Sequence, residues 1–251
     1  MTKGILKPKE DAFGQEMQSY YSGKDMCEIV ERDDGYFSAY HSSNVYFSEY
    51  ASWPDIEKEA MKLVKGRVLD VGCGVGRHAL YLQEKGFDVT GIDVSPLALR
   101  IARLRGLKKA KLMSIRHLDF KPESFDTVIL LGGNLGLIGT PEHGKEIFRK
   151  LLKIVSVDGI ILGETRDPYK TDDPLHLEYH KRNIEGGRLG GQMKIRVRFQ
   201  KNVSRWFAWL LLSKDEIKQL VNGTGWEVTG FLDSKDAGYV VILKKSSGKK
   251  R

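Results

Sequence analysis

The sequence predicts an α/β fold, in which helices cover a sheet of mostly parallel strands. Between residues 54 and 165, apolar runs of period two alternate with helical segments that have well-marked ends. Strands that alternate with helices in this way form βαβ units with right-handed crossovers. The first strand also runs directly into a glycine-rich turn, VGCGVG at 71–76, which is typical of a ligand-binding edge of such a sheet.

The first half of this core has a clear order of elements. A helix is expected over 54–65, stopped by Gly66, and a strand over 67–71. The glycine turn then opens a helix that extends to about residue 85, before the strand 87–93. Ser95 and Pro96 are an N-cap and a proline at the first helical position, so they begin a helix that ends at Gly106.

The second half of the core continues the same alternation. A short strand at 110–113 precedes a strand at 125–131, and Thr140 opens a helix that extends to about residue 155. The strand 159–165 follows. Ser213 and Glu216 form a capping box that opens a helix over 213–222, and strands at 226–232 and 239–245 complete the core.

Three segments lie outside this core. Nine of the 24 aromatic residues fall within residues 20–53 without a clean period, and we interpret residues 1–53 as an aromatic-rich, helical N-terminal lid. A simpler alternative is that these rings only anchor an N-terminal helix to the core. Residues 166–192 have the composition of an irregular insertion, and two runs at 193–199 and 205–212 are spaced for an antiparallel β-hairpin. Residues 246–251 form a basic tail.

The chain has a formal net charge of +8, from 41 Lys and Arg against 33 Asp and Glu. Most of the excess lies in two places, the acid-free stretch 94–118 and the residues after 243. A solvated helix face and a terminal tail account for charge placed in this way. The basic balance is therefore only a weak argument for nucleic-acid binding.

The sequence also argues against several locations and site types. No apolar run of 18 residues occurs, and the N-terminal MTKGILKPKEDAFG lacks an apolar signal core, so we expect a cytoplasmic location and no membrane partner. The two cysteines, Cys27 and Cys73, are too few for a disulfide framework or a zinc site. We expect no metal.

The glycine turn and two acids carry the chemistry. Glycines at the end of a strand let the backbone approach a ligand closely. Asp93 ends the second strand, where a carboxylate can accept hydrogen bonds from both hydroxyls of a ribose. Asp70 lies inside the first strand, and a buried carboxylate there needs a partner such as a ligand ammonium. With Asp119 beyond the third strand, these acids fit a ligand that has an amino acid at one end and a nucleoside at the other, as S-adenosylmethionine has.

Two alternatives stay open at this point. The glycines alone also fit a purely structural tight turn. The run from Gly74 to Ala79 satisfies the G-x-G-x-x-A form of the dinucleotide fingerprint, which would indicate an NAD(P)-dependent oxidoreductase.

The chain resembles the class I S-adenosylmethionine-dependent methyltransferases in a series of motifs. These are VLDVGCGVGRHALYL, GIDVSPLAL, HLDF at 117–120, SFDTVILLGGNLGLI and LLKIVSVDGIILGE. The resemblance covers roughly residues 54–165 and returns at 213–245. It implies a doubly wound, mostly parallel sheet of seven strands, with the last strand antiparallel in a hairpin with its neighbour.

The resemblance also implies roles for individual residues toward S-adenosylmethionine. Asp70 would lie by the methionine ammonium, and Gly72, Cys73 and Gly74 belong to the turn that cradles the methionine part. The remaining cofactor residues would be Asp93 on the ribose, Val94 on adenine, Leu118 and Asp119 at the adenine edge, and Leu131, Gly132 and Asn134 beside the sulfonium. We expect Cys73 itself to be a small buried packing residue.

Methyl transfer from a sulfonium is an in-line displacement, so the protein mainly positions the acceptor and excludes water. We expect a nucleophilic O or N of a small molecule as acceptor, with S-adenosylhomocysteine as product, under a cover formed by 1–53 and 166–212. His176 or His180 could remove a proton, and Tyr20 or Tyr36 could orient the acceptor or face the sulfonium. The alternative is that these four are ordinary hydrogen-bonded residues.

Other functions compete with this one. An RNA (tRNA or rRNA) methyltransferase is the second choice, and a cofactor-binding protein without catalysis is a further one. The sequence argues against exocyclic base amines, because LGGN stands where an Asn/Asp-Pro-Pro-aromatic run is usual, and against pyrimidine C5, because neither cysteine is suitably placed.

The predicted hairpin has one apolar face and one cationic face. Lys194, Arg196 and Arg198 alternate with apolar residues, and such a strand is either half-solvated or binds an anionic acceptor or acidic partner. Its second strand carries the aromatic residues Trp206, Phe207 and Trp209, so a homodimer through 193–212 stays open.

Overall fold

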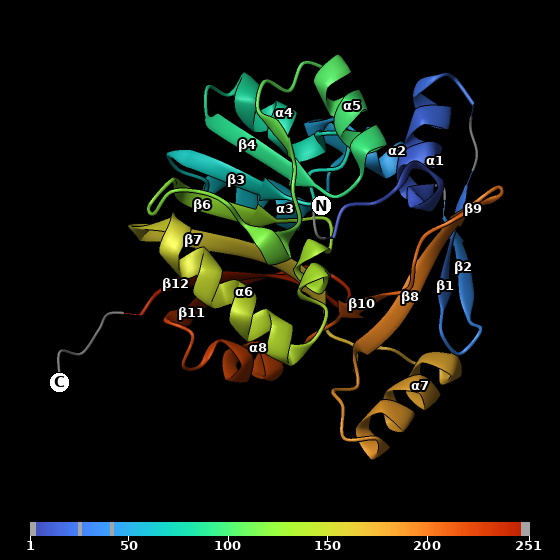
Figure 1. Ribbon diagram of the computed structural model, residues 1–251. Helices are drawn as coiled ribbons and strands as arrows, with labels where there is room; N and C mark the ends of the chain where they lie inside the picture. Colours follow the sequence, from blue (N-terminus) through green and yellow to red (C-terminus); the bar gives the residue numbers. More distant parts are fainter. Residues whose placement is uncertain (1–3, 25–26, 41–42, 247–251) are drawn as a thin grey trace. The chain divides into compact units, whose positions relative to one another are not determined.

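The computed structural model describes residues 4–24, 27–40 and 43–246 of the chain (Figure 1). Its main sheet has seven strands in the order β11-β12-β7-β6-β3-β4-β5. The strands are β3 Arg67–Val71, β4 Asp88–Asp93, β5 Ala110–Leu112, β6 Phe125–Leu130, β7 Val155–Arg166, β11 Trp226–Asp233 and β12 Gly238–Lys245. This order departs from the order in the chain, so helical crossovers connect the strands, as predicted.

Strand direction follows the prediction as well. β4 pairs with β5 and β6 with β7 in parallel, whereas β12 is antiparallel to both β7 and β11. In these four pairs, β12 is the strand that runs opposite to its neighbours, because the hairpin from β11 turns the chain back into the sheet beside β7. The mostly parallel α/β fold with a C-terminal antiparallel hairpin is confirmed.

The helices of the core begin at the expected caps. They are α3 Asp55–Lys62, α4 Arg77–Glu84, α5 Pro96–Leu104, α6 Pro141–Ile154 and α8 Lys214–Val221. The side chains of Ser95, Thr140 and Ser213 each accept a hydrogen bond from a backbone amide in the first turn, and Ser213 forms the predicted capping box with Glu216. The 3-10 helices η3 Ile115–His117 and η4 Asn134–Ile138 complete this part.

A second sheet was not predicted. β1 Glu28–Arg32 and β2 Phe37–Tyr40 form a hairpin, and β1 pairs antiparallel with β8 Gln192–Phe199. The order is β10-β8-β1-β2, where β10 is Phe207–Leu210 and the short β9 Asn202–Val203 pairs with β8. The hairpin at 193–212 is thus present, but as part of a larger sheet.

The N-terminal segment is therefore only partly helical, which corrects the expectation of a helical lid. It contains η1 Pro8–Glu10, α1 Ala12–Tyr21, the β1–β2 hairpin, α2 Ser43–Tyr46 and η2 Tyr50–Ser52. The physical reason is the turn at Asp33, Asp34 and Gly35, where Gly35 takes a positive φ of 91° between two runs of β-favouring residues.

The segment 166–192 is also more regular than expected. A 12-residue helix, α7 Pro174–Glu185, begins after Asp173, whose side chain accepts a hydrogen bond from the Leu175 amide. Asp173 and Pro174 are an N-cap and a first-turn proline. The apolar residues that follow, Leu175, Leu177 and Ile184, are largely exposed and give no helical period to detect.

The chain divides into two compact units, each with its own packing. The first comprises residues 1–53, 70–118 and 193–209, and Met17, Val75, Ala98 and Ile101 form a core cluster in it. The second comprises 54–69, 119–192 and 210–251. There the indole nitrogen of the buried Trp226 donates to the carbonyl of Phe148 at 2.8 Å.

Among the described residues, no helix has the length and apolar character needed to cross a membrane. The basic tail expected at 246–251 lies outside the described residues beyond Ser246.

Candidate functional site

The glycine turn of the first unit is bound to the end of the neighbouring strand. The amides of Gly72 and Cys73 both donate to the carbonyl of Ile92, at 2.8 and 3.0 Å. Gly72 and Gly74 have φ values of 73° and 52°, which favour glycine. The turn therefore presents bare backbone at the carboxyl ends of β3 and β4, where open α/β sheets bind their ligands.

Asp93 stands at the centre of this edge. Its Oδ2 accepts a hydrogen bond from the Gly74 amide and its Oδ1 from the Ser95 amide, both at 2.8 Å. Burial raises the pKa of this carboxyl, and the two backbone hydrogen bonds oppose that rise. An ionised carboxylate can accept about four hydrogen bonds, so Asp93 is held by the backbone and keeps capacity for two more donors.

Asp70 is the second acid of the edge. Its side chain is only 1% exposed, and its Oδ2 has no hydrogen-bond partner among the residues that the structure describes. Burial raises its pKa to about 6 and Asp93 adds to the rise, while His78 and Arg77 at the start of α4 oppose it. A cation placed against Oδ2 would offset the cost of burying this charge.

Cys73 lies in the same turn but faces the interior. A Cβ atom at Gly91 of β4 would lie 2.7 Å from its Sγ, so the thiol packs directly on that glycine. Burial raises the pKa of the Cys73 thiol well above its usual range, and Asp70 adds to the rise. The side chain is thus a packing residue, as expected, and only its backbone faces the turn.

The N-terminal segment contacts this edge through particular residues that were not predicted. The Leu6 amide donates to the carbonyl of Val94 at 3.1 Å. A Cβ atom at Gly74 would lie 3.5 Å from the ring of Phe13 on α1, and that ring packs edge-on against Tyr46 at 5.0 Å. These partners are distant in sequence, so no local pattern marks them.

The other predicted cofactor residues divide between the units. Leu118, half-buried, caps η3 in the first unit. In the second unit Asp119 is exposed and Leu131 is buried. Gly132 has a φ of 70°, and its amide donates to Oε2 of Glu164 on β7 at 2.6 Å. Asn134 begins η4. Glu164, which fixes the loop after β6, was not predicted.

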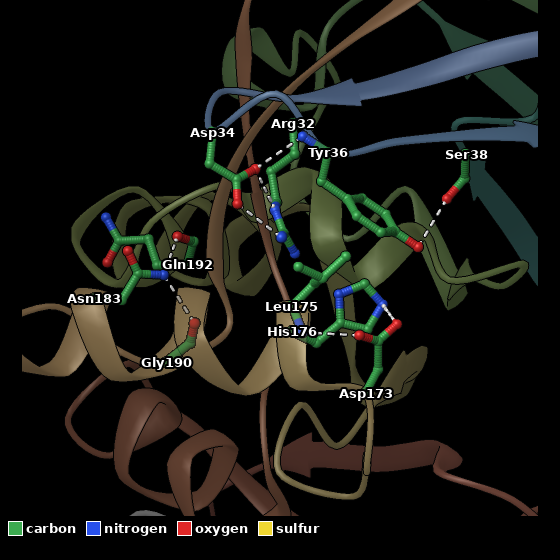
Figure 2. A network of polar contacts seen from close by, with 10 residues as sticks. All are labelled: Arg32, Asp34, Tyr36, Ser38, Asp173, Leu175, His176, Asn183, Gly190 and Gln192. Atoms are coloured by element: carbon green, nitrogen blue, oxygen red, sulfur yellow. Dashed lines mark hydrogen bonds and ion pairs between the residues drawn. The ribbon is translucent and has the colours of Figure 1, made fainter.

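The two tyrosines named from the sequence both lie in the first unit. The hydroxyl of Tyr20 on α1 donates to Oδ1 of Asn44 at 2.8 Å. Figure 2 shows Tyr36 beside Arg32 and Ser38 of the β1–β2 hairpin. The Arg32 guanidinium lies 4.7 Å from the centre of the Tyr36 ring, and the Ser38 hydroxyl donates to the Tyr36 hydroxyl at 3.2 Å.

The two histidines both lie on α7 in the second unit. Nε2 of His176 is 3.7 Å from a carboxylate oxygen of Asp173, and both side chains are partly exposed (Figure 2). His180 is buried, with its ring centre 6.2 Å from that of Tyr169. The environment of His180 is that of a packed core residue, whereas His176 is accessible.

The cationic face of β8 is partly neutralised. Arg196 binds the carboxylate of Glu31 on β1 through two hydrogen bonds at 2.8 and 2.9 Å, and Arg198 binds the same carboxylate. The two guanidinium groups lower the pKa of Glu31 to about 2. Arg196 also lies 4.4 Å from the centre of the Trp206 ring, so its charge serves contacts within the sheet.

The residues of the first unit fit S-adenosylmethionine. Oδ2 of Asp70, which has no partner in the described ranges, suits an ammonium, and the spare capacity of Asp93 suits two ribose hydroxyls. The glycine backbone leaves room for the chain between them. Bound there, the cofactor would supply a methyl group already activated on a sulfonium.

Comparisons with known proteins agree with this geometry. Residues 68–159 match a family described as a methyltransferase domain. A solved SAM-dependent methyltransferase from Bacteroides fragilis, in complex with S-adenosyl-L-homocysteine, is 26% identical, with a TM-score of 0.83 over 97% of this chain and 98% of that chain.

Curated relatives match a shorter part. The "Putative methyltransferase YqeM" of Bacillus subtilis is 28% identical over 142 residues, 54% of this chain and 56% of its own length. The glycine/sarcosine N-methyltransferase of Aphanothece halophytica is 30% identical over 107 residues, 40% of each chain. The chain thus spans about half the length of the curated relatives it matches. The matched domain and the full-length structural match confirm the resemblance of the chain to class I S-adenosylmethionine-dependent methyltransferases.

Proposed function

We propose that this protein transfers the methyl group of S-adenosylmethionine to a nucleophilic oxygen or nitrogen of a small molecule. The observation that carries the donor half is the pair of acids at the strand ends. Asp93 is fixed by two backbone amides, and Asp70 keeps a buried oxygen without a partner in the described part of the chain. A ligand with hydroxyls at one place and an ammonium at the other satisfies both.

The proposed donor residues have distinct tasks. Asp70 holds the ammonium, Gly72 and Gly74 line the methionine part, and Asp93 orients the ribose. Val94, Leu118 and Asp119 are proposed at the adenine, and Leu131, Gly132 and Asn134 beside the reacting centre. Because two backbone amides already hold the Asp93 side chain, it loses little conformational freedom when the donor binds, and this favours affinity.

Several aromatic groups of the first unit suit the sulfonium side. Phe13 lies against Gly74, and its ring packs edge-on with that of Tyr46. Burial raises the pKa of the Tyr46 phenol well above its usual range, and nearby Glu28, Glu16 and Asp93 add to the rise. Electron-rich rings also attract a cation such as a sulfonium. We propose that this pair helps exclude water there.

The acceptor half of the proposal is supported by the names of two relatives. The curated relatives include a glycine/sarcosine N-methyltransferase and a ubiquinone biosynthesis O-methyltransferase, both named for small molecules. We propose that Tyr36 and Tyr20 orient the acceptor. His176, accessible and next to Asp173, is the proposed proton acceptor, and His180 is a less suitable one because it is buried beside Tyr169.

Cys73, the cysteine of the glycine turn, is unsuited to RNA methylation at pyrimidine C5. Two relatives are named as uracil C5 methyltransferases of 23S rRNA and tRNA, but they match only 29% and 33% of their own length. That reaction needs a thiolate, and Cys73 is buried against Gly91 with a raised pKa.

The test is incubation of the purified protein with methyl-labelled donor and a cell extract, followed by separation by size. We expect label in a fraction of low molecular mass that is sensitive to neither nuclease nor protease. Label in nuclease-sensitive material would show that the acceptor is RNA and not a small molecule. No transfer by a protein that still binds the donor would leave a cofactor-binding protein without catalysis.

A further inference from the structure

One carboxylate, that of Asp11, caps two helices of the first unit. Its Oδ1 accepts a hydrogen bond from the Gly14 amide in the first turn of α1, at 2.9 Å. Its Oδ2 accepts from the Ser95 hydroxyl at 2.8 Å and from the Leu97 amide of α5 at 3.2 Å. Asp11 is fully buried. A single acid thus joins the starts of two helices that are more than 80 residues apart in sequence.

The same network reaches the proposed ribose carboxylate through Ser95. The Ser95 hydroxyl donates to Asp11 and accepts from the Ala98 amide at 3.0 Å, which fixes its orientation. The Ser95 amide donates to Oδ1 of Asp93 at 2.8 Å. Ser95 therefore connects the two acids: its hydroxyl binds Asp11 and its backbone amide binds Asp93. The link consists entirely of short hydrogen bonds between buried or half-buried groups.

The energetics make this link sensitive to small changes. Burial raises the pKa of Asp11, and the hydrogen bonds from Ser95, Leu97 and Gly14 oppose the rise. The positive ends of two helix dipoles add to the stabilisation of the charged form. If Asp11 loses its charge, or if one of its oxygens is replaced by a donor, buried N–H or O–H groups lose their acceptor. Such an unsatisfied donor costs free energy in an environment without water.

Gly14 shows how closely the two helices meet at this point. A Cβ atom there would lie 2.5 Å from both Oδ2 of Asp11 and Oγ of Ser95. No side chain fits, so α1 approaches the start of α5 only because residue 14 is glycine. The close approach is thus specific to this sequence, and it places the N-terminal helix in direct contact with the Ser95 turn.

We infer that Asp11 is a positioning residue for donor binding, which acts through Ser95 on Asp93 and makes the N-terminal helix part of the ribose site. This inference rests on the proposed function, because it assumes that Asp93 holds the ribose. It also predicts that donor binding and docking of α1 favour each other, since both depend on the same turn.

The test compares the affinities of two ligands, S-adenosylhomocysteine and its 2′-deoxy analogue, by calorimetry. In the wild-type protein, loss of the hydroxyl should weaken binding about tenfold, the typical effect of one hydrogen bond to a charged group. Asp11→Asn keeps the shape but removes the charge and one of the two acceptor oxygens, so a single oxygen can no longer serve both helix starts. We expect it to weaken S-adenosylhomocysteine about tenfold and to reduce the discrimination between the two ligands to about twofold.

The ratio of the two ligand affinities distinguishes a positioning role of Asp11 from a purely structural role in attaching α1. A purely structural role would weaken both ligands equally and leave their ratio unchanged, which would overturn the inference. Glu10→Gln is the matched control, because Glu10 fastens the same segment through Arg205 at 2.8 Å without contacting Ser95. It should leave the ratio at its wild-type value.

Ser95→Ala keeps the inference testable if Asp11→Asn does not fold. It removes the hydroxyl that joins the two acids but retains the backbone amide that binds Asp93, and it should reduce the ratio in the same way. A wild-type protein that does not bind S-adenosylhomocysteine would overturn the proposed function. Normal wild-type binding with an unchanged ratio in both variants would overturn only the role of Asp11.

Discussion

The buried carboxylate of Asp70 should weaken the fold and strengthen donor binding at the same time. Its pKa is raised from 3.8 to about 6 by burial, so the folded state favours its protonated form. The contribution of this group to stability is therefore complete below pH 3.8 and is lost as the pH rises through about 6. A shift of this size corresponds to about 3 kcal/mol at pH 7.

The perturbation is Asp70→Asn, which removes the charge and keeps an oxygen for the hydrogen bond that the carboxylate receives from the Ala79 amide. At pH 7 we expect the free energy of unfolding to rise by up to about 3 kcal/mol, less the cost of burying the new amide. The same change should reduce affinity for S-adenosylhomocysteine, because the ligand ammonium loses its counter-charge. Asp88→Asn, at an exposed ion pair with Lys109, is the control and should change stability by less than about 0.5 kcal/mol.

The assays are urea unfolding and calorimetric titration between pH 5 and 8. Wild-type affinity for S-adenosylhomocysteine should fall as the pH is lowered through about 6, by up to about tenfold per unit, because binding requires the ionised carboxylate. The affinity of Asp70→Asn should vary much less over that range. Two results would refute this reasoning. One is an equal pH dependence of ligand affinity in the wild type and in Asp70→Asn. The other is an equal loss of unfolding free energy between pH 5 and pH 7 in the two proteins.

Further predictions concern packing and charge in the first unit. Gly14→Ala should destabilise the protein by about 1–3 kcal/mol in thermal or urea unfolding, because the new methyl group overlaps buried oxygens; a change within error would show that α1 can move away freely. In the native protein a thiol reagent should modify Cys27, which is partly exposed, well before Cys73, which is buried with a raised pKa; equal rates would contradict the packing role. Glu31→Gln should cost about 1 kcal/mol or less at pH 7, and this difference should shrink below pH 4.5 and disappear as the pH falls through about 2; a constant difference across that range would exclude the ion pair as its cause.

Local signals explain why the core could be predicted from the sequence. Ser95 with Pro96, and Ser213 with Glu216, mark helix starts through contacts within four residues. The glycine turn and Asp93 follow from strand ends that a parallel sheet brings to one edge. Each of these features depends on neighbouring residues, so its pattern is visible in the sequence itself.

The second sheet and the Asp11 link depend on distant partners instead. β1 pairs with β8 across more than 160 residues, and the sequence pattern of neither strand indicates its partner. The turn at Gly35 was a usable signal for the β1–β2 hairpin, and Asp173 with Pro174 for α7. The contact between Asp11 and Ser95 had no such signal, because it exists only once α1 packs on α5.

We propose above all that the edge formed by the glycine turn and Asp93 binds the donor. Its most direct test is calorimetric titration of S-adenosylhomocysteine into the wild-type protein and Asp93→Ala, with circular dichroism to verify that the variant is folded. We expect saturable one-to-one binding by the wild type and no detectable binding by a folded Asp93→Ala. Unchanged affinity in the folded variant would contradict it.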